Sequence, residues 1–170
     1  QLSACFIQSV KDSIESLCQL QTNETMLFRN GSGTGTNFST LRELAAPLSN
    51  GGSSSGPVSF VKGFDTWAGI TKSAGKTRRA AKMVILNVDH PDIEDFIKSK
   101  VTVEKMARDL IKMGWPADYN SETYSFLPYQ NANHSVRVTD DFMKAVEQDK
   151  NFDLINFKKV KVKELSAKNL

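Results

Sequence analysis

Two short segments rich in glycine carry the residue types that bind phosphate groups. Residues 31–36 read Gly-Ser-Gly-Thr-Gly-Thr, and residues 74–79 read Ala-Gly-Lys-Thr-Arg-Arg. Glycine lets the backbone approach a ligand closely, and Lys and Arg side chains pair with phosphate oxygens. The first segment is not a P-loop, because no Gly-Lys-Ser/Thr closes it, and its glycines follow a helix instead of opening one as in a dinucleotide-binding fingerprint. Each segment alone is more often a turn, but two loops, one of them cationic, favour recognition of a polyphosphate.

The positive charges of the chain are concentrated in two runs. The formal net charge is only +3, yet no acidic residue occurs between Asp65 and Asp89. The basic residues of that interval are Lys72, Lys76, Arg78, Arg79 and Lys82. They imply an anionic partner such as phosphate, a nucleotide or nucleic acid. The second run is equally well explained as a solvated face, because its lysines alternate with valines at the period of a half-exposed strand. It contains Lys158, Lys159, Val160, Lys161, Val162 and Lys163.

The cysteines and histidines show no spacing typical of a metal centre. Cys5 and Cys18 are too few for a disulfide scaffold or a four-ligand zinc site. His90 precedes a proline where a helix is expected to begin, so an N-cap role explains it, and His134 is isolated. No Gly-x-Ser-x-Gly elbow is present, so hydrolytic catalysis has no support. We therefore expect no metal site, and we expect Cys18 to pack on the apolar face of its helix, which it shares with Ile14 and Leu17.

Alternating strands and helices are expected to position these residues, which is typical of an α/β fold with part of a parallel sheet or barrel. In the first half, the predicted elements are a strand at 2–8 with buried neighbours, a helix at 12–29 capped by Asp12 and ended by Asn30 and Gly31, a loop over 31–56 with a short ordered piece near 38–42, a helix at 57–70 begun by Pro57, and a strand at 81–88. In the second half they are helices at 90–98 and 103–113, extended segments at 124–129 and 135–138, a helix at 140–148 capped by Thr139, and a hairpin of 152–156 with 160–165.

Length and composition suit one domain, or a piece of a larger one. The 170 residues are 39% apolar and 24% charged, which is sufficient for a packed core. The longest aliphatic stretch, 83–86, is far shorter than the roughly 20 residues of a membrane helix, and no secretory signal opens the chain. We expect a cytoplasmic protein with no membrane partner, and Gln1 in place of Met suggests a truncated or processed chain. Aromatic residues are spaced like core residues without a stacking platform, which disfavours nucleic acid as the partner.

Several segments taken together resemble the large adenosylcobalamin-dependent (class II) ribonucleotide reductases. The likeness is collinear and covers nearly the whole chain. The segments are Gln-Leu-Ser-Ala-Cys-Phe at 1–6, Asp-Ser-Ile-Glu-Ser at 12–16, the run from Asn30 to Arg42, Ser-Gly-Pro-Val-Ser-Phe at 55–60, Gly-Lys-Thr-Arg-Arg-Ala-Ala-Lys-Met at 75–83, Val-Asp-His-Pro-Asp-Ile-Glu at 88–94, and the run from Gln130 to Asp140.

The resemblance implies a role for each matching position. It implies that Cys5 reduces the substrate as one half of a redox pair, with Ser3 and Ala4 beside the ribonucleotide, and that adenosylcobalamin is the cofactor. It also implies a regulatory site for a deoxynucleotide effector, and a homodimer formed through the helix at 12–29. The implied effector-binding residues are Asp12, Ser13, Ser32, Gly33, Thr34 and Gly35 of a first specificity loop at 32–38 with the helix before it, Arg42, and Lys72, Lys76, Thr77, Arg78 and Arg79 of a second specificity loop.

The sequence also departs from the family's pattern. The family carries its radical on a cysteine in an Asn-x-Cys-x-Glu loop, and this motif does not occur in the 170 residues. We therefore predict an incomplete portion of a ten-stranded α/β barrel that does not reduce ribonucleotides by itself. It would be a single fragment, 1–170, with the redox strand, effector helix and first loop in 1–56, the second loop with its following strand and helix in 57–100, and further barrel elements in 101–170. The alternative is a freestanding nucleotide- or nucleic-acid-binding module without catalysis.

Overall fold

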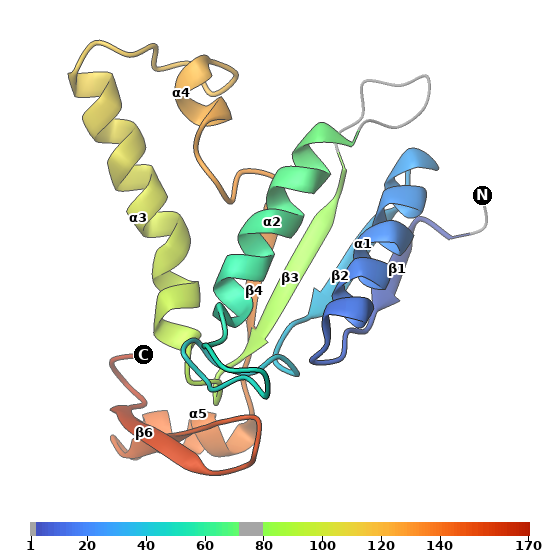
Figure 1. The fold of residues 1–170 in the computed structure, drawn as a ribbon. Helices are drawn as coiled ribbons and strands as arrows, with labels where there is room; N and C mark the ends of the chain where they lie inside the picture. The colour runs from blue at the N-terminus through green and yellow to red at the C-terminus, as the bar shows by residue number, and fades with distance from the viewer. Residues whose placement is uncertain (1–2, 72–79) are drawn as a thin grey trace.

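The computed structural model describes residues 3–71 and 80–170, and four parallel strands form its central sheet (Figure 1). The strands lie side by side in chain order, so each neighbouring pair needs a crossover connection, which a helix supplies. The strands are β1 (Cys5–Gln8), β2 (Gly33–Asn37), β3 (Lys82–Asn87) and β4 (Ala132–Arg137). The connecting helices are α1 (Ile14–Arg29), α2 (Gly56–Ile70) and α3 (Ile93–Lys112).

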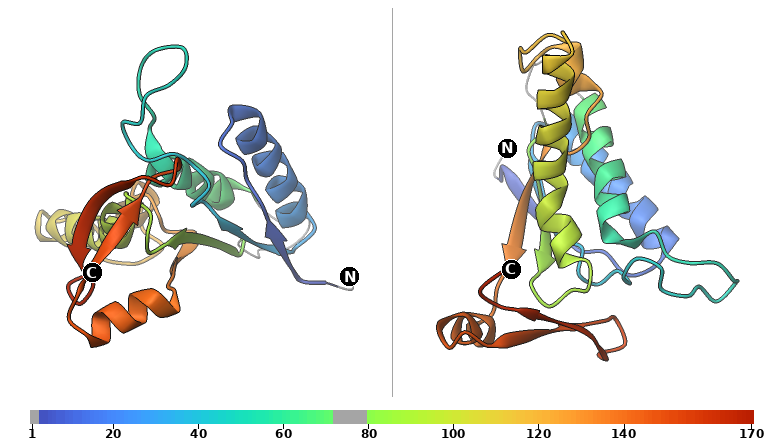
Figure 2. Two further views of the ribbon diagram at one scale, coloured as in Figure 1. Left: turned by 90° about the horizontal axis from the view of Figure 1, so that it is seen from below. Right: turned by 90° about the vertical axis from the view of Figure 1, so that its left-hand side faces the viewer.

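All three connecting helices lie against the same face of the sheet (Figures 1 and 2). Repeated right-handed crossovers between adjacent strands give this arrangement, which is that of a section of an α/β barrel. The α/β prediction is confirmed. The other face, which we call the open face, is not covered by any described element, and Ile7 on it is 93% exposed. Cys5, Gly33 and Met83 also lie on the open face.

The elements that follow β4 lie beyond the carboxyl ends of the strands, whereas the helix before β4 lies at the opposite end of the sheet (Figure 1). The short helix α4 (Glu122–Ser125) precedes β4, and α5 (Asp140–Glu147) leads to an antiparallel hairpin of β5 (Asn151–Ile155) and β6 (Lys161–Ser166). As predicted, the Thr139 hydroxyl caps α5, accepting a hydrogen bond from the Phe142 amide at 3.2 Å. The hairpin is also confirmed. The alternation of lysines and valines at 158–163 does not bury the valines, because Val160 and Val162 are both more than half exposed, which agrees with the solvated-face interpretation.

The main core lies between the sheet and the helices. Val84 and Leu86 alternate with outward-facing neighbours on β3 and are fully buried. They belong to one cluster with Phe38, Phe64 and Phe96, in which the rings of Phe38 and Phe64 meet edge to face at 5.4 Å. This packing fixes the orientation of β3 and its neighbours, and thereby decides which side chains point to the open face.

Helix α1 differs from its prediction at the N-cap and in its buried face. Ser13, not Asp12, is the N-cap, and its hydroxyl accepts a hydrogen bond from the Ser16 amide at 3.2 Å. The buried residues of α1 are Leu17, Leu20, Glu24 and Phe28. Ile14 and Cys18 are exposed instead. The buried residues follow one another at intervals of three or four along α1, starting at Leu17. Cys18 lies about 100° further round the helix than Leu17, so its side chain points away from the sheet.

Three other segments differ from the sequence-based expectations. Residues 33–37, predicted as loop, form β2 in the middle of the sheet. The predicted helices at 90–98 and 103–113 are one continuous helix, α3, because no glycine or proline separates them and Ile93, Phe96, Val103 and Ala107 form one buried face. Part of the 124–129 segment, predicted as extended, belongs to the helix α4.

His90 is buried, and Asp92 takes the N-cap position of α3. The His90 Nε2 lies 3.0 Å from the Leu41 carbonyl oxygen, and its Nδ1 accepts a hydrogen bond from the Asp92 amide at 3.1 Å. A neutral ring that donates through Nε2 satisfies both contacts. His90 therefore connects the segment after β2 to the start of α3. No helix formed by residues 3–71 or 80–170 is both long and apolar enough to cross a bilayer.

Candidate functional site

Cys5 begins the edge strand of the sheet, and its thiol lies on the open face. It pairs in register with Gly33 of β2, which carries no side chain. A Cβ atom on Gly33 would lie 3.4 Å from the Cys5 Sγ and 3.1 Å from the Ala81 carbonyl oxygen. Gly33 therefore leaves the space beside the thiol open. Cys5 is exposed, because β1 pairs only with β2 among the described strands and no described element covers that face.

Ser3 and Ala4 lead into β1 and are exposed. The Ser3 hydroxyl donates to the Cys5 carbonyl at 3.2 Å, and the Ala4 carbonyl accepts from the Gly33 amide at 2.7 Å. The hydrogen bond to the Ala4 carbonyl continues the pairing of β1 with β2 beside Cys5. Ser3, Ala4 and Cys5 are thus exposed together at the amino end of β1, with a free thiol and a hydroxyl among them, and the buried Gly33 lies beside the thiol.

Asp12, Ser13 and Arg42 come together at the other end of these strands. The Arg42 Nε donates to the Asp12 Oδ2 at 2.6 Å, and the Arg42 backbone amide donates to the Asp12 Oδ1 at 3.3 Å. About a quarter of each side chain is exposed. With Ser13 they line a cavity of about 230 Å³, and Leu48, Ser53, Ser54, Ser55 and Phe60 are among the residues that close it. This cavity combines a charged pair, hydroxyl groups and an apolar wall.

The structure therefore separates the predicted effector residues. Ser32 and Gly33 lie at the amino end of β2 beside Cys5, whereas Asp12 and Arg42 follow the carboxyl ends of β1 and β2. Thr34 is buried, and its hydroxyl donates to Glu24. Gly35 lies within the strand. The residues of the second specificity loop, Lys72, Lys76, Thr77, Arg78 and Arg79, lie outside the described residues.

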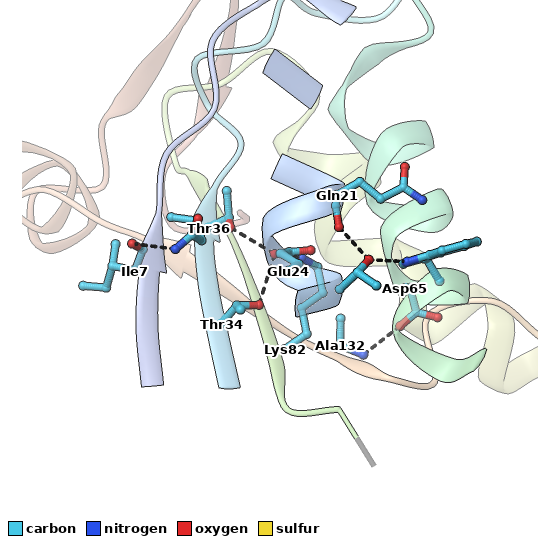
Figure 3. Close-up of polar contacts among 11 residues, drawn as sticks. Ile7, Gln21, Glu24, Thr34, Thr36, Asp65, Lys82 and Ala132 are labelled. Atoms are coloured by element: carbon cyan, nitrogen blue, oxygen red, sulfur yellow. Dashed lines mark hydrogen bonds and ion pairs between the residues drawn. The ribbon is translucent and has the colours of Figure 1, made fainter. Parts of the chain in front are cut away.

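The sequence analysis missed a buried ion pair between α1 and the sheet. Glu24 and Lys82 form a salt bridge with less than 4% of either residue exposed. The Glu24 Oε1 also accepts hydrogen bonds from Thr34 at 3.1 Å and Thr36 at 3.3 Å, and Figure 3 shows these four side chains meeting between helix and sheet. The Lys82 ammonium lies 4.9 Å from the Phe64 ring centroid.

This ion pair changes the interpretation of the first basic run. Burial lowers the pKa of Lys82, and the neighbouring Glu24 opposes that shift. The prediction that Lys82 faces an anionic partner is therefore wrong, because its charge is compensated inside the protein by Glu24. The sequence held a signal for this: Lys82 alternates with the buried Val84 and Leu86, which places all three on one face of β3.

A second buried carboxylate, that of Asp65 on α2, holds the start of β4. It accepts hydrogen bonds from the backbone amides of Gln130, Asn131 and Ala132 at 3.1, 2.8 and 2.7 Å, and the bond to Ala132 is visible in Figure 3. Three backbone donors satisfy the buried charge. Asp65 is therefore a structural residue, and it fixes where β4 joins the sheet.

His134 on β4 is also turned toward the helices. Its ring stacks on Phe96 with centroids 4.8 Å apart, and its Nδ1 lies 3.3 Å from the Ser99 hydroxyl. Burial lowers the pKa of His134 to about 4, and the charge of Lys100 acts in the same direction. His134 is consequently neutral at pH 7, and it packs between α3 and the sheet.

The chain matches known proteins over nearly its whole length. Residues 3–170 match the family described as ribonucleotide reductase, barrel domain. A vitamin B12-dependent ribonucleotide reductase of Rhodopirellula baltica is 53% identical over 152 residues, covering 89% of this chain and 15% of that protein. A protein of the same name from Streptomyces avermitilis is 52% identical over 171 residues, covering 100% and 18%. A vitamin B12-dependent ribonucleoside-diphosphate reductase of Thermoplasma acidophilum is 38% identical, covering 97% and 19%. The chain spans less than a fifth of the length of each relative.

Proposed function

The chain belongs to the ribonucleotide reductase barrel-domain family, and we propose that it forms one section of the catalytic barrel of a vitamin B12-dependent reductase. Such a reaction replaces the 2′-hydroxyl of a ribonucleotide by hydrogen. The hydroxyl leaves as water, and two thiols supply the two electrons and become a disulfide. In this proposal Cys5 is one of the two thiols, and the other comes from outside this chain.

The observation that carries this proposal is the environment of the Cys5 thiol. It is exposed on the open face beside a residue without a side chain, so a ligand and a second thiol can both approach it. Ser3 and Ala4 border the same surface and are the proposed substrate contacts. Adenosylcobalamin would supply the radical that starts the reaction. No group of three or more His, Cys, Asp or Glu side chains that could hold a metal ion occurs among the described residues.

Replacing Cys5 by Ser in the intact reductase tests the role of the thiol. We expect repeated turnover with a dithiol reductant to be lost, because no disulfide can form with Ser. Cys18→Ser is the matched control, since Cys18 is equally an exposed thiol but lies on α1. Turnover of Cys5→Ser at the rate of Cys18→Ser would contradict the assignment.

We further propose that the cavity at Asp12, Ser13 and Arg42 binds the deoxynucleoside triphosphate effector. The Arg42 guanidinium can pair with an anion or a base oxygen, Asp12 and Ser13 can accept from sugar or base donors, and the apolar wall can cover a base. The adjoining loop contains Gly51 and Gly52, and glycine loses more backbone freedom than other residues when a ligand fixes it, so the affinity of the chain alone should be low. For Ser32, Gly33, Thr34 and Gly35, contact with the effector stays a prediction.

Calorimetric titration of the chain with dNTPs tests the effector site. Arg42→Ala should weaken binding, and added salt should weaken wild-type binding. Arg29→Ala is the matched control, because Arg29 is exposed at the opposite end of α1. Replacing Arg78 and Arg79 together by Ala tests the second specificity loop in the same assay. If short DNA binds far better than any dNTP, the chain is instead a nucleic-acid-binding module.

The exposed surface of α1 supports the proposed homodimer. Ile14 is 62% exposed and Met26 is 51% exposed. Met26 lines a shallow cavity together with Cys18 of the same helix and Trp67 of α2. Exposed apolar side chains of this size on and beside a helix favour burial against a partner. Light scattering with effector present should detect a dimer, and Met26→Glu should dissociate it. A monomer at high concentration would count against this contact.

A further inference from the structure

Phe157, at the turn between β5 and β6, lies against Arg42. The centre of its ring is 5.3 Å from the Arg42 Cζ, which is within the range of a cation–π interaction. Phe157 is 38% exposed and does not belong to either hydrophobic cluster of the described residues. The Nζ of the neighbouring Lys158 also lies 5.6 Å from the ring centre, so Phe157 contacts two cations and not the core, and Arg42 is the one that comes from a different part of the chain.

Arg42 needs several contacts to keep one orientation, because it is a long and partly exposed side chain. Its Nε donates to Asp12, and its Nη1 approaches the Pro47 carbonyl at 3.4 Å. These contacts lie at the edge of the planar guanidinium. The Arg42 Cζ lies over the Phe157 ring, and this further contact limits rotation of the guanidinium about its bond to the side chain.

The turn that carries Phe157 is itself held in place. The Asn156 Oδ1 accepts hydrogen bonds from the backbone amides of Lys158 and Val160, both at 3.0 Å. The Ile155 amide donates to the Asp89 carbonyl at 2.7 Å, which attaches the hairpin just beyond the end of β3. Phe157 is thus presented to Arg42 from a fixed support.

We propose that Phe157 is a positioning residue for the effector cavity. Its ring holds the Arg42 guanidinium in the orientation that pairs with Asp12 and faces a bound nucleotide. The inference rests on the proposed effector role of Asp12, Ser13 and Arg42. It adds the hairpin, more than a hundred residues further along the chain, to the regulatory site.

The first test needs no nucleotide. In the 170-residue chain, the NMR signal of the Arg42 Nε–H should be shifted by the nearby ring and should exchange slowly with water, since it is bonded to Asp12. Phe157→Leu should remove the shift and accelerate the exchange, and Phe157→Tyr should restore both. Phe126→Leu is the matched control, because Phe126 is also an exposed phenylalanine but packs on Trp115. An Arg42 signal unchanged by Phe157→Leu would overturn the proposal.

The second test measures nucleotide affinity. A cation–π contact at a partly exposed site corresponds to a change in affinity of about 2- to 5-fold. Phe157→Leu should therefore weaken the tightest-binding dNTP by that factor, and Phe157→Tyr should recover it. In an Arg42→Ala background, Phe157→Leu should add nothing. Equal losses with and without Arg42 would overturn the positioning role while leaving the effector site intact, whereas a wild-type chain that binds no dNTP would refute the effector site itself.

Discussion

Replacing Glu24 by Gln should destabilise the chain by about 3–5 kcal/mol, because it leaves a buried ammonium without its carboxylate. Lys82 is 3% exposed, and its pKa is already lowered by burial, with Glu24 as the largest opposing influence. The Gln side chain keeps the shape and can still accept from Thr34 and Thr36. The decrease in the free energy of unfolding therefore reports the cost of the uncompensated Lys82 charge, and not the cost of a cavity. It would be a large part of the 5–15 kcal/mol typical of a whole domain.

Removing the second charge should reverse most of this loss. The double variant Glu24→Gln, Lys82→Met has no buried charge, and Met packs against Phe38 and Phe64, which now flank the ammonium. Replacing a buried ion pair by neutral groups of similar volume is often neutral in free energy, so we expect the double variant to lie within about 2 kcal/mol of the wild type.

Urea unfolding followed by circular dichroism gives the free energies for this comparison. Glu104→Gln is the matched control, since it makes the same chemical change in the exposed i,i+4 pair with Arg108. That change should cost no more than about 0.5 kcal/mol. The reasoning would be refuted if Glu24→Gln cost no more than Glu104→Gln, or if adding Lys82→Met made the protein still less stable.

Two further predictions concern Gly33 and His134. Gly33→Ala should destabilise the chain by about 1–3 kcal/mol and slow alkylation of Cys5, since its Cβ would lie 3.1 Å from a backbone oxygen and 3.4 Å from the thiol sulfur. Gly35→Ala, whose Cβ would meet only Met83 at 4.0 Å, should be neutral or slightly stabilising in the same urea and labelling assays; equal effects of the two would contradict this account. The unfolded chain protonates His134 near pH 6.5 and the folded chain only near 4, so the free energy of unfolding should fall by up to about 3 kcal/mol as the pH drops through that window. His134→Gln should flatten this dependence in pH-resolved urea titrations, and a slope unchanged from the wild type would show that another group causes it.

Local signals predicted the elements that carry them. Pro57 at the start of α2, the Thr139 cap of α5 and the alternation around Val84 and Leu86 each restrict the backbone within a few residues, and these elements are confirmed. The face of α1 was wrong because Leu17 fits two stripes, one through Ile14 and Cys18 and one through the buried residues further along. Only contact with the sheet decides between them.

Two ion pairs, Glu24 with Lys82 and Asp12 with Arg42, could not be predicted, because the residues that they join are distant in the sequence. Glu24 and Lys82 are 58 positions apart, and nothing near either residue indicates the other. The pairing of Asp12 with Arg42 is similar, since it required a strand where the composition of residues 31–36 indicated a loop. Once β2 is placed beside β1, Arg42 necessarily follows the same end of the sheet as Asp12.

The composition of β2 connects the thiol to the buried ion pair. Beside Cys5 the strand needs a glycine, and β2 consists only of Gly, Thr and Asn, so it has no aliphatic side chain to pack against α1. Its attachment to the helix must come from hydrogen bonds instead, and Thr34 and Thr36 make them to one acceptor, Glu24. A carboxylate buried there needs a compensating cation, which Lys82 supplies from the next strand. The space left for chemistry at Cys5 thus accounts for a charged pair in the core on the opposite face of the same sheet.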